Sequence, residues 1–499
     1  MNNKARKSAL DTTRAENFAD WYQAVITGAD MAEPSGVRGC MIIKPWGFAI
    51  WERIKGHLDR EIRATGHENC YFPIFIPIDL IQKEATHVEG FAKEMAIVTH
   101  HRLESRDGKL IPAAPLEIPL VIRPTSETVI GEAFARWIKS YRDLPVKINQ
   151  WANVVRWELR PRMFLRTTEF LWQEGHTAHA TAEEAVEHTK TMLGVYRHVV
   201  ENCMAIPVIA GTKSLGERFP GAVETHTIEA MMQDGRALQS GTSHYLGQNF
   251  SKAANITFQD RNGESQLAYT TSWGVSTRLI GALIMVHSDD DGLRLPPKIA
   301  PYHVVVIPII RNDTQGDAVI QACQSLAHQL GGQSFADEPV RVFVDLRDES
   351  AAVKRWKWIK KGIPFICEIG PRDNEKSEVS VHKRLEVGAK PTVYGVGSFV
   401  SGITNELAMV QQQLTDSALA TQASMTRNDI KNAAELEAFF NSGNGFVRGK
   451  LREGPEADEV LRGLGVTIRC IPYDQAGDEG RCIITGEPAV LDVVLARAY

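Results

Sequence analysis

A basic residue, a carboxylate and several aromatic residues lie close together near the first third of this 499-residue chain. Two apolar runs, 151–157 and 163–172, alternate as strands do, and a proline-bearing turn between them predicts a hairpin. Successive side chains of a strand point to opposite faces, so Arg156 and Glu158 should share one face. Such a face offers a cation, a carboxylate and aromatic planes together. A salt-bridged ribbon with solvated arginines would show the same pattern.

Thr125 and Glu127 form a second polar pair, two residues apart and directly after Pro124. Proline restricts the local backbone, so a hydroxyl and a carboxylate can converge there on one small cation. The alternative is an N-cap, because a helical pattern follows at 129–138. Both interpretations fit the residues.

Two further stretches carry groups suited to ligand binding. Small residues at 240–243 allow close approach of the backbone, and Gln239, Thr242 and His244 supply polar atoms nearby. A simple turn between two strands would also explain them. Arg278 precedes an apolar helix predicted at 279–287, and its planar, permanently charged guanidinium can stack on an aromatic system. A surface arginine is the alternative there.

Length and composition limit the kind of protein that presents these groups. The length favours about three domains, and 43% hydrophobic with 23% charged residues is ordinary for a chain that buries several cores. The formal net charge of −5 gives no global nucleic-acid signal, so any RNA contact must be a local patch.

Seven cysteines, an odd number scattered along the chain, do not form a disulfide framework and indicate a reducing compartment. The basic N-terminus has no apolar segment behind it, and nowhere do eighteen apolar residues run together. We therefore expect a cytoplasmic protein with no membrane segment.

The first half of the chain reads as strands and helices that could hold these residues. Four-residue steps between Ile50, Ile54, Leu58 and Ile62 predict a helix with one buried stripe, ended by Gly66. Residues 70–77 predict a strand whose prolines confine it to an edge, and 182–204 and 227–234 have helical patterns. Residues 287–292 lack the ligand spacing of a calcium loop and predict a solvated turn.

After a stiff proline-rich linker at 295–301, the pattern changes. Strands are predicted at 304–310, 340–346 and 365–369, and helices at 317–330 and 351–361. Alternation of this kind predicts a parallel or mixed α/β sheet. Residues 354–361 hold five cations and two indoles, which is typical of an RNA patch but also of a solvated amphipathic helix.

Several motifs together indicate a family. Residues 156–158 and 164–170 resemble motif 2 of the class II aminoacyl-tRNA synthetases, and 171–176 resembles the prolyl-tRNA synthetases of the archaeal and eukaryotic type. Residues 46–77 resemble motif 1, which builds the dimer interface, and 271–278 resembles motif 3.

The resemblance covers essentially the whole chain and implies its organisation. It implies an α+β catalytic domain at 1–292, with an antiparallel sheet flanked by helices, and a linker at 293–302. An α/β anticodon-binding-type domain at 303–410 and a small α+β C-terminal appendage at 411–499 follow.

The resemblance also implies the site. Three arginines are expected to be catalytic: Arg156 on the α-phosphate of ATP, and Arg166 and Arg278 on the outer phosphates. Mg²⁺ is expected with ATP, contacted by Glu169 and Gln239. The full ATP set implied by the family is Arg156, Glu158, Arg166, Thr167, Phe170, Gln239, Thr242 and Arg278.

Proline itself is expected in a small pocket. Its ring nitrogen is a charged secondary amine with two hydrogens, so it needs hydrogen-bond acceptors within mostly apolar walls. The residues that the resemblance implies for this pocket are Phe91, Thr125, Glu127, Arg156, Trp172, Glu174, His176, His244 and Ser276.

The implied function is activation of L-proline with ATP to prolyl adenylate, and transfer of proline to tRNA(Pro) by a homodimer. Residues 177–234 are too few for the editing insertion of bacterial-type prolyl enzymes, so editing in cis is not expected. Two alternatives remain: a paralogue that forms the adenylate but reads the anticodon differently or passes proline to another acceptor, and a non-catalytic RNA-binding relative.

The second half departs from the family pattern at residues that would read the anticodon. Arg355, Ile359 and Ile366 stand where relatives have an aromatic residue, a glutamate and an arginine, and 382–384 also differs. In the appendage, Cys470 and Cys482 remain without the other thiols of a four-ligand site, so we expect no zinc there. The final Tyr499 matches relatives whose terminal carboxylate approaches the active site.

Overall fold

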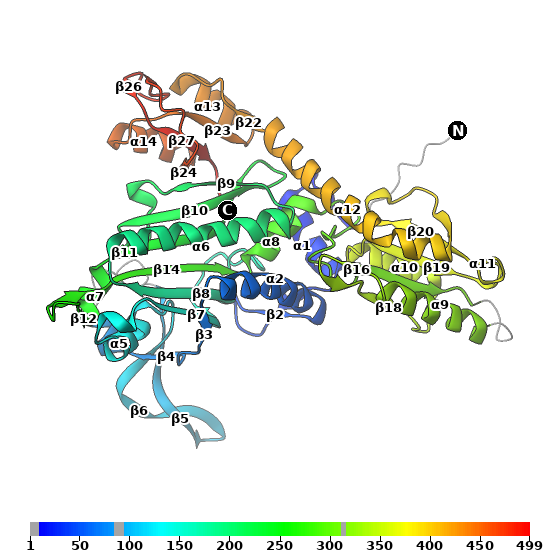
Figure 1. Cartoon of the computed structure of the whole chain (residues 1–499), viewed down its shortest axis with the longest axis horizontal. Helices are drawn as coiled ribbons and strands as arrows, with labels where there is room; N and C mark the ends of the chain where they lie inside the picture. The colour runs from blue at the N-terminus through cyan, green and yellow to red at the C-terminus, as the bar shows by residue number, and fades with distance from the viewer. Residues whose placement is uncertain (1–8, 84–93, 311–315) are drawn as a thin grey trace.

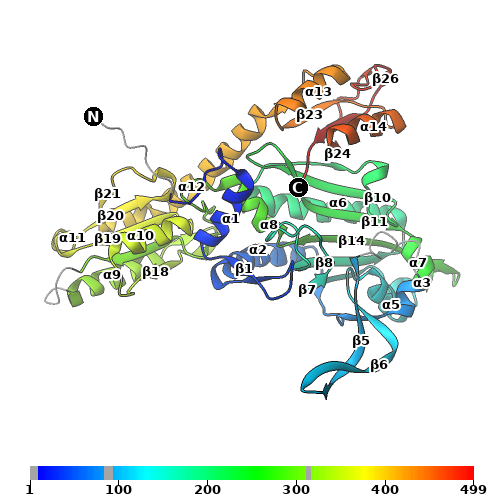
Figure 2. The same ribbon diagram turned by 180° about the vertical axis from the view of Figure 1, so that it is seen from behind.

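The computed structural model describes residues 9–83, 94–310 and 316–499. Figure 1 shows a large sheet-based unit, an α/β unit at one end and a small unit above, from which the chain returns to end beside the large unit. A long hairpin projects from the large unit, and Figure 2 shows the same hairpin from behind. Among the helices in these residues, none has both the length and the apolarity needed to cross a membrane.

One eleven-stranded sheet organises the molecule. Its pairs are antiparallel except at the two ends, where β3 pairs with β7 and β22 with β23 in parallel. The antiparallel sheet expected for the catalytic unit is therefore confirmed. The strands in spatial order are β22 (Thr426–Arg427), β23 (Phe446–Lys450), β27 (Asp492–Ala496), β24 (Thr467–Pro472), β9 (Val208–Thr212), β10 (Glu224–Met231), β11 (Ala237–Gly247), β14 (Tyr269–Ser276), β8 (Glu169–His179), β7 (Val146–Val155) and β3 (Glu68–Asn69).

The helices of the large unit follow the apolar periodicity. Helix α2 buries all four predicted stripe residues completely, and Gly66 follows its end with a φ of +84°, a conformation that favours glycine. Helix α6 packs along one face of the sheet over β11 and β14 (Figure 1). The helices here are α1 (Phe18–Gly28), α2 (Pro45–Ala64), α3 (Ile78–Lys83), α5 (Glu127–Trp137), α6 (Ala182–Asn202), α7 (Asn249–Ala254) and α8 (Arg278–His287).

Over the described part of the chain, the large unit also contains three smaller sheets. The projecting hairpin of β5 and β6 pairs with β4 in a three-stranded sheet, and β1 with β2 and β12 with β13 form two-stranded sheets. Their strands are β1 (Ala32–Pro34), β2 (Met41–Ile43), β4 (Phe75–Pro77), β5 (Ala96–Arg106), β6 (Lys109–Ile122), β12 (Thr257–Gln259) and β13 (Ser265–Leu267).

Three predictions of helices and strands were wrong. Residues 227–234 were predicted as a helix but belong mostly to β10, where seven of the eight residues are buried, so both faces of the strand are apolar or shielded and the alternation disappears. Residues 70–77 form no single strand, because only the last three, β4, pair in a sheet and 70–74 are irregular. The return strand expected from 163 begins only at Glu169, since Phe164 adopts a φ of +62° within a tight turn.

The α/β unit has a five-stranded mixed sheet in the order β18-β15-β19-β20-β21. Strands β18, β15 and β19 are parallel, and β20 pairs antiparallel with both β19 and β21, so the predicted α/β alternation is confirmed. Its elements are β15 (Val304–Pro308), α9 (Gly316–Gly331), β16 (Ser334–Phe335), β17 (Glu338–Pro339), β18 (Val342–Val344), α10 (Ala351–Lys360), β19 (Phe365–Ile369), α11 (Pro371–Lys376), β20 (Glu378–Lys383) and β21 (Thr392–Gly395).

Helix α12 (Val396–Ser424) connects this unit to the last one. The predicted division between 410 and 411 falls inside this continuous helix, so the two parts are joined by a helix and not by a loop. The remaining elements are α13 (Ala433–Ser442), α14 (Pro455–Leu464), β25 (Gly480–Arg481) and β26 (Pro488–Ala489).

Residues 287–292, predicted as a solvated turn, form a buried junction instead. Asp289 is 6% exposed and accepts two hydrogen bonds from the guanidinium of Arg384 in the α/β unit, at 2.6 and 3.0 Å. Arg294 pairs with the same carboxylate at 2.7 Å. Burial would raise the pKa of Asp289, but the two arginines hold it below its ordinary value. The prediction failed because the partner lies 95 residues away in the sequence.

We expect Arg384→Ala to destabilise the protein by about 3 kcal/mol, because it leaves a buried carboxylate with one cation fewer. Urea unfolding monitored by tryptophan fluorescence measures the loss. The matched control is Lys383→Ala, which removes a half-buried pair with Glu406 and should cost less than about 1 kcal/mol. Equal effects of the two substitutions would contradict the importance of this junction.

Three buried histidines lie together on the side of the large sheet that α6 covers. The rings of His67 and His179 lie 5.0 and 5.1 Å from that of His188, and the nitrogens of His67 and His188 approach to 3.2 Å. Burial, and then neighbouring charges that include Lys147, lower the pKa of His67 and His179 to about 3 and that of His188 to about 4. All three are therefore neutral in the folded protein at neutral pH.

Acid should therefore weaken the fold through this cluster. The unfolded chain binds protons on these histidines near pH 6.5, whereas the folded chain does not until pH 3–4. Stability is thus lost as pH falls below 6.5, by about 2 kcal/mol per histidine at pH 5. The thermal midpoint of His188→Gln should fall less between pH 7.5 and 5 than that of the wild type. A substitution of the exposed His328 is the control, and identical pH profiles for all three proteins would refute the cluster's role.

Candidate functional site

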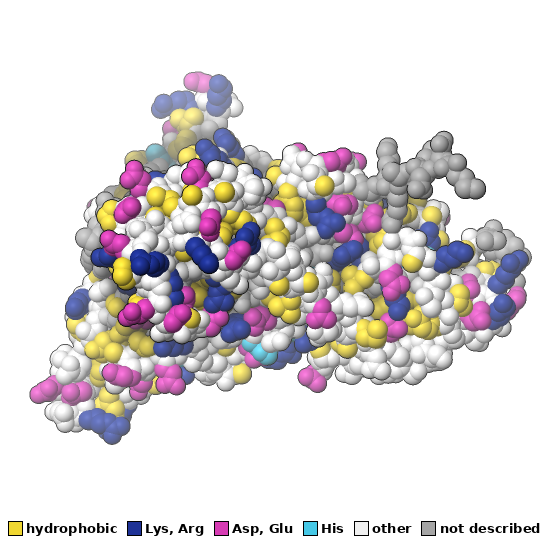
Figure 3. Space-filling model, turned by 90° about the horizontal axis from the view of Figure 1, so that it is seen from above, with side chains coloured by type: hydrophobic (Ala, Val, Ile, Leu, Met, Phe, Trp, Pro, Cys, Tyr) yellow, Lys and Arg dark blue, Asp and Glu magenta, His cyan; other side chains and the backbone are white. Residues whose placement is uncertain are grey.

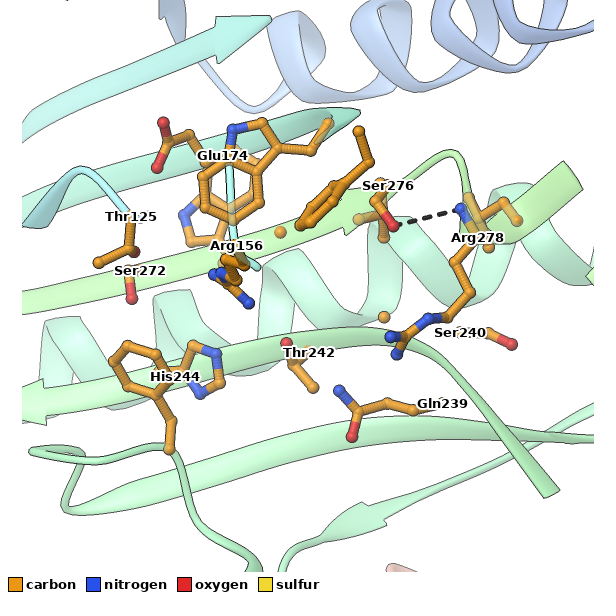
Figure 4. A pocket seen from close by; sticks show the side chains of 18 of the residues that line it. Thr125, Arg156, Glu174, Gln239, Ser240, Thr242, His244, Ser272, Ser276 and Arg278 are labelled. Atoms are coloured by element: carbon orange, nitrogen blue, oxygen red, sulfur yellow. Dashed lines mark hydrogen bonds between the residues drawn. The ribbon is translucent and has the colours of Figure 1, made fainter. Parts of the chain in front are cut away.

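A cavity of about 540 Å³ lies on the face of the sheet opposite α6. Alternation along β8 produces this arrangement, because Trp172, Glu174 and His176 point into the cavity while Gln173 accepts a hydrogen bond from Tyr196 of α6. Strands β11 and β14 supply the floor, and the segment between β7 and β8 supplies one wall. Figure 4 shows polar side chains along the whole length of the cavity.

The structure brings together nearly all the predicted site residues. Phe91 lies outside the described residues, and Glu169 does not reach the cavity, since it is exposed and accepts a hydrogen bond from Asn153 at 2.8 Å. The predicted residues that line the cavity are Thr125, Glu127, Arg156, Glu158, Arg166, Thr167, Phe170, Trp172, Glu174, His176, Gln239, Thr242, His244, Ser276 and Arg278.

One end of the cavity is rich in acceptors. The Thr125 hydroxyl donates to the buried Glu127 carboxylate. Glu127 is also the first residue of α5, but Thr125 does not cap that helix, because Ser126 occupies the N-cap position. The helix and the acceptor pair predicted from the sequence therefore coexist.

Glu174, 3% exposed, is the centre of the same end. Its Oε1 accepts hydrogen bonds from Ser126 Oγ at 2.5 Å and Gln150 Nε2 at 2.7 Å, and its Oε2 lies 3.0 Å from His176 Nε2. Burial would lower the pKa of His176, but the hydrogen bond and charge of Glu174, together with Glu127, raise it. Two carboxylates thus face a small space that suits a compact organic cation.

His244 also lines the acceptor-rich end of the cavity, and its imidazole is neutral. Burial lowers its pKa to about 4, against the charge of Glu127. Its ring stacks on Phe219 at 4.5 Å, and its Nδ1 lies 3.1 Å from the Thr225 hydroxyl. A neutral imidazole adds polarity without a competing positive charge.

Arg156 lies between the two ends (Figure 4). Its Nε donates to the carbonyl of Pro124 at 2.8 Å, and its guanidinium lies 5.6 and 5.7 Å from the rings of Phe170 and Trp172. Burial lowers its pKa, but the carboxylates of Glu127, Glu94 and Glu174 oppose the shift. An arginine in this position stays charged and is well oriented for an anion.

The other end is cationic. Arg278 Nε donates to the carbonyl of Leu165 at 3.2 Å, and its backbone N–H donates to Ser276 Oγ, as drawn in Figure 4. Burial, and then the charges of Arg156 and Arg166, lower the pKa of Arg278 to about 10, so the group remains protonated at neutral pH. Three arginines converging on one cavity favour a polyanion such as a triphosphate.

Mg²⁺ would find suitable oxygen donors at this end. Of the two expected contacts, Gln239 lines the cavity and Glu169 does not. Glu158, which was expected only to bind ATP, also lines the cavity and offers a carboxylate. Mg²⁺ prefers one or two carboxylates together with substrate phosphates and water. Within the described residues, no group of three or more His, Cys, Asp or Glu side chains has metal-binding geometry.

Some lining residues were missed by sequence reasoning. Phe219 and Thr225 line the cavity beside His244, and Figure 4 shows Ser272 at the same acceptor-rich end. Thr225 lies opposite His244 in the β10–β11 register, and Ser272 lies opposite His176 in the β14–β8 register. Recognising β10 as a strand would have placed Thr225, but Phe219 lies in an irregular segment without a signal of its own.

The predicted RNA patch at 354–361 is partly internal. Lys354 is 4% exposed and donates to the carbonyl of Asp345, and Trp358 donates to the Asp345 carboxylate at 2.8 Å. Arg355 and His382 both pair with Glu368. Arg355 and His382 line a second cavity of about 160 Å³ together with Ile359 and Ile366. On the face shown in Figure 3, basic and acidic side chains are interspersed.

The C-terminal tail is held beside the large cavity. The N–H of Tyr499 donates to the carbonyl of Ala237 at 3.1 Å, and its hydroxyl donates to Asp234 at 2.7 Å. Ala237 lies two residues before Gln239 on β11. Cys470 and Cys482, the remaining cysteines of the appendage, are both buried.

Comparison with known proteins agrees with this geometry. Residues 114–287 match the tRNA synthetase class II core domain (G, H, P, S and T), and residues 303–395 match the anticodon binding domain. The chain is 52% identical over 507 residues to a proline–tRNA ligase of Protochlamydia amoebophila, with 100% of both chains covered. It is 53% identical over 500 residues to that of Paramagnetospirillum magneticum, covering 99% of this chain and 100% of the relative. It is 52% identical over 512 residues to proline–tRNA ligase 2 of Anaeromyxobacter dehalogenans, with full coverage of both.

Proposed function

Because the chain belongs to the proline–tRNA ligase family of class II aminoacyl-tRNA synthetases, we propose that it activates L-proline with ATP and transfers the prolyl group to tRNA(Pro). The observation that carries this proposal is a single cavity with carboxylate acceptors at one end, cationic side chains at the other and Arg156 between them. The class II core followed by an anticodon-binding domain, predicted from the sequence, is confirmed by the family matches.

Proline binding uses the acceptor-rich end. The pyrrolidinium nitrogen carries two hydrogens, and Thr125, Glu127 and Glu174 offer oxygens for them. Trp172 and Phe219 are apolar walls for the ring, and Arg156 is placed to bind the proline carboxylate or the phosphate it attacks. Binding of the substrate cation replaces the Thr125–Glu127 hydrogen bond with charge-assisted contacts.

Adenylate formation is an in-line attack of the proline carboxylate on the α-phosphorus of ATP. A P–O bond forms to proline as the bond to the β-phosphate breaks, and pyrophosphate leaves. No side-chain base is needed, because the attacking carboxylate is already ionised. Arg156 stabilises charge on the α-phosphate, while Arg166 and Arg278 bind the outer phosphates.

Glu158 and Gln239 would hold Mg²⁺, which neutralises charge on the phosphates when bound. Phe170 lies against Arg156 and is available to stack on the adenine, with Arg278 over its other face. In the second step, a terminal ribose hydroxyl of the tRNA attacks the prolyl carbonyl and releases AMP.

Further features of the protein belong to the same proposal. We place the catalytic domain at 1–292, the linker at 293–302, the anticodon-binding-type domain at 303–410 and the appendage at 411–499. We assign the archaeal and eukaryotic type, because the described chain between His176 and Gln239 holds only α6, β9, η3 (Leu215–Glu217) and β10 and has no room for an editing domain. We expect no zinc in the appendage, and a cytoplasmic location where tRNA is charged.

We also propose a homodimer. The motif 1 helix α2 presents a wide groove on its outer side, lined by Phe48, Trp51, Lys55 and Trp151. Phe48 is 41% exposed in the single chain, which supports an additional partner over this face. Sedimentation at micromolar concentration tests the state.

Transfer of proline to purified tRNA(Pro), and to the same tRNA with a mutated anticodon, tests the function. Efficient charging that depends on the anticodon is expected. Adenylate formation without charging would favour instead a paralogue with another acceptor, which the Glu368 contacts of Arg355 and His382 motivate. A protein with neither activity would be a non-catalytic RNA-binding relative.

A further inference from the structure

A buried ionic cluster lies beside the cationic end of the cavity. Glu229 of β10 is fully buried, and Lys213 and Arg469 are 2% and 7% exposed. Glu229 Oε1 accepts hydrogen bonds from Lys213 Nζ and Thr227 Oγ1, both at 2.8 Å. Its Oε2 accepts two from Arg469, at 2.9 and 3.1 Å. Nothing in the proposed reaction uses these groups.

The cluster joins the C-terminal appendage to the active-site sheet. Arg469 belongs to β24 of the appendage, and β24 pairs with β9 only through Ile471 and Pro472. Lys213 Nζ also donates to the carbonyl of Arg469 at 2.8 Å. The ionic contact is therefore a major connection between the two parts on this face.

Strand register places the Glu229 carboxylate on the cavity side. Thr225 lies opposite His244 and lines the cavity, and Glu229 follows it at four residues, on the same face of β10. Across a bulge, Glu229 lies opposite Gln239, which also lines the cavity. The appendage thus holds the Glu229 carboxylate beside Gln239, one of the residues proposed to bind the nucleotide.

The Glu229 carboxylate also interacts electrostatically with a cation of the cavity, Arg278. The charges of both Glu229 and Arg469 act on Arg278, with opposite effects on its pKa. Gln239 and Arg278 lie at the same end of the cavity (Figure 4). Without Arg469, Oε2 of Glu229 would lose both of its donors while Oε1 keeps Lys213 and Thr227. That oxygen would therefore compete with the triphosphate for the Arg278 guanidinium, because a buried carboxylate oxygen that has lost its cation favours another one.

We propose that Arg469 is a positioning residue for ATP: it binds Glu229, keeps that carboxylate away from Arg278 and so leaves Arg278 available to the outer phosphates. The inference rests on the proposed function and adds a role for the C-terminal appendage in nucleotide binding. Arg469 acts through Glu229 and does not itself line the cavity.

Proline-dependent ATP–pyrophosphate exchange tests this role. Arg469→Ala should raise the KM for ATP about tenfold, the effect of one lost charge-assisted contact, while the KM for proline changes less than about twofold. Arg469→Lys keeps the cation and should restore most of the ATP affinity. Arg469→Gln, which keeps a donor to Glu229 without the charge, should give an intermediate KM and serves if the alanine variant does not fold.

The decisive protein is the double variant Glu229→Gln with Arg469→Ala. It removes the competing carboxylate as well and leaves the same net charge in the cluster as in the wild type. Its KM for ATP should return towards the wild-type value, although it has lost more contacts than the single variant. If Arg469 had only a structural role, the double variant would have a higher KM for ATP than Arg469→Ala, because it has lost more contacts.

Tyr473→Phe is the matched control at the same junction. It removes the hydrogen bond between Tyr473, the residue directly after β24, and His226, which faces away from the cavity, and should leave both KM values unchanged. Two results would overturn this inference and leave the proposed function standing. One is an unchanged KM for ATP in Arg469→Ala. The other is an equal rise of the KM for ATP and for proline that the double variant does not reverse. Absence of proline-dependent exchange in the wild type would overturn the proposed function together with it.

Discussion

Arg156→Ala is expected to reduce proline-dependent ATP–pyrophosphate exchange by about a thousandfold. Arg156 lies between the acceptor-rich and cationic ends, so its guanidinium is placed where the carboxylate of proline meets the α-phosphate. Its Nε bond to Pro124 and its contacts with Phe170 and Trp172 hold the group in place before substrates arrive. The effect should fall on kcat, because charge on the α-phosphate increases in the transition state.

Arg160→Ala is the matched control, since Arg160 is an exposed arginine of the same β7–β8 connection and does not line the cavity. It should retain exchange within about twofold of the wild type. Full exchange by Arg156→Ala, in a preparation that unfolds at the wild-type temperature, would contradict the assigned position of the α-phosphate.

Glu127→Gln should raise the KM for proline about a hundredfold, because a buried cation loses its ionised acceptor. The substitution keeps the size of the side chain and a hydrogen-bond partner for Thr125, so the pocket should keep its shape. The KM for ATP should change little, since Glu127 lies at the other end of the cavity. Exchange kinetics with each substrate varied in turn separate these effects.

The ligand offers an independent test of the same contact. Tetrahydrofuran-2-carboxylate has an oxygen in place of the ring nitrogen of proline, and so lacks both the charge and the hydrogens. As competitive inhibitors of exchange, proline analogues with the charged nitrogen should lose affinity in Glu127→Gln, whereas this oxygen analogue should not. Glu132→Gln, a change on the outer side of α5, is the control. Equal losses for both kinds of analogue would show that Glu127 does not bind the nitrogen.

Local patterns in the sequence predicted much of this architecture. The four-residue apolar steps of α2 correspond to a stripe that is completely buried, and the strand–helix alternation after residue 303 matches the mixed sheet. The motif residues identified the cavity, because fifteen of the predicted side chains line it. Each of these signals depends on residues close together in the sequence or on a family motif.

Features that depend on distant contacts were not predictable in this way. Strand β10 is buried on both faces and lacks alternation, so it was mistaken for a helix. The partnership of Asp289 with Arg384, and that of Glu229 with Arg469, joins residues from different units. Glu169 has the right chemistry for Mg²⁺, but alternation along β8 points it away from the face that carries Phe170 and Trp172, so it stays outside the cavity.

The central claim is that this cavity selects and activates proline. Exchange of labelled pyrophosphate into ATP, measured separately with each of the twenty amino acids, tests it most directly. We expect exchange with proline to exceed that with every other amino acid, with the smaller alanine and cysteine next, since neither fills the space between Trp172 and the two carboxylates as a pyrrolidine ring does. Exchange driven best by another amino acid, or by none, would contradict the account.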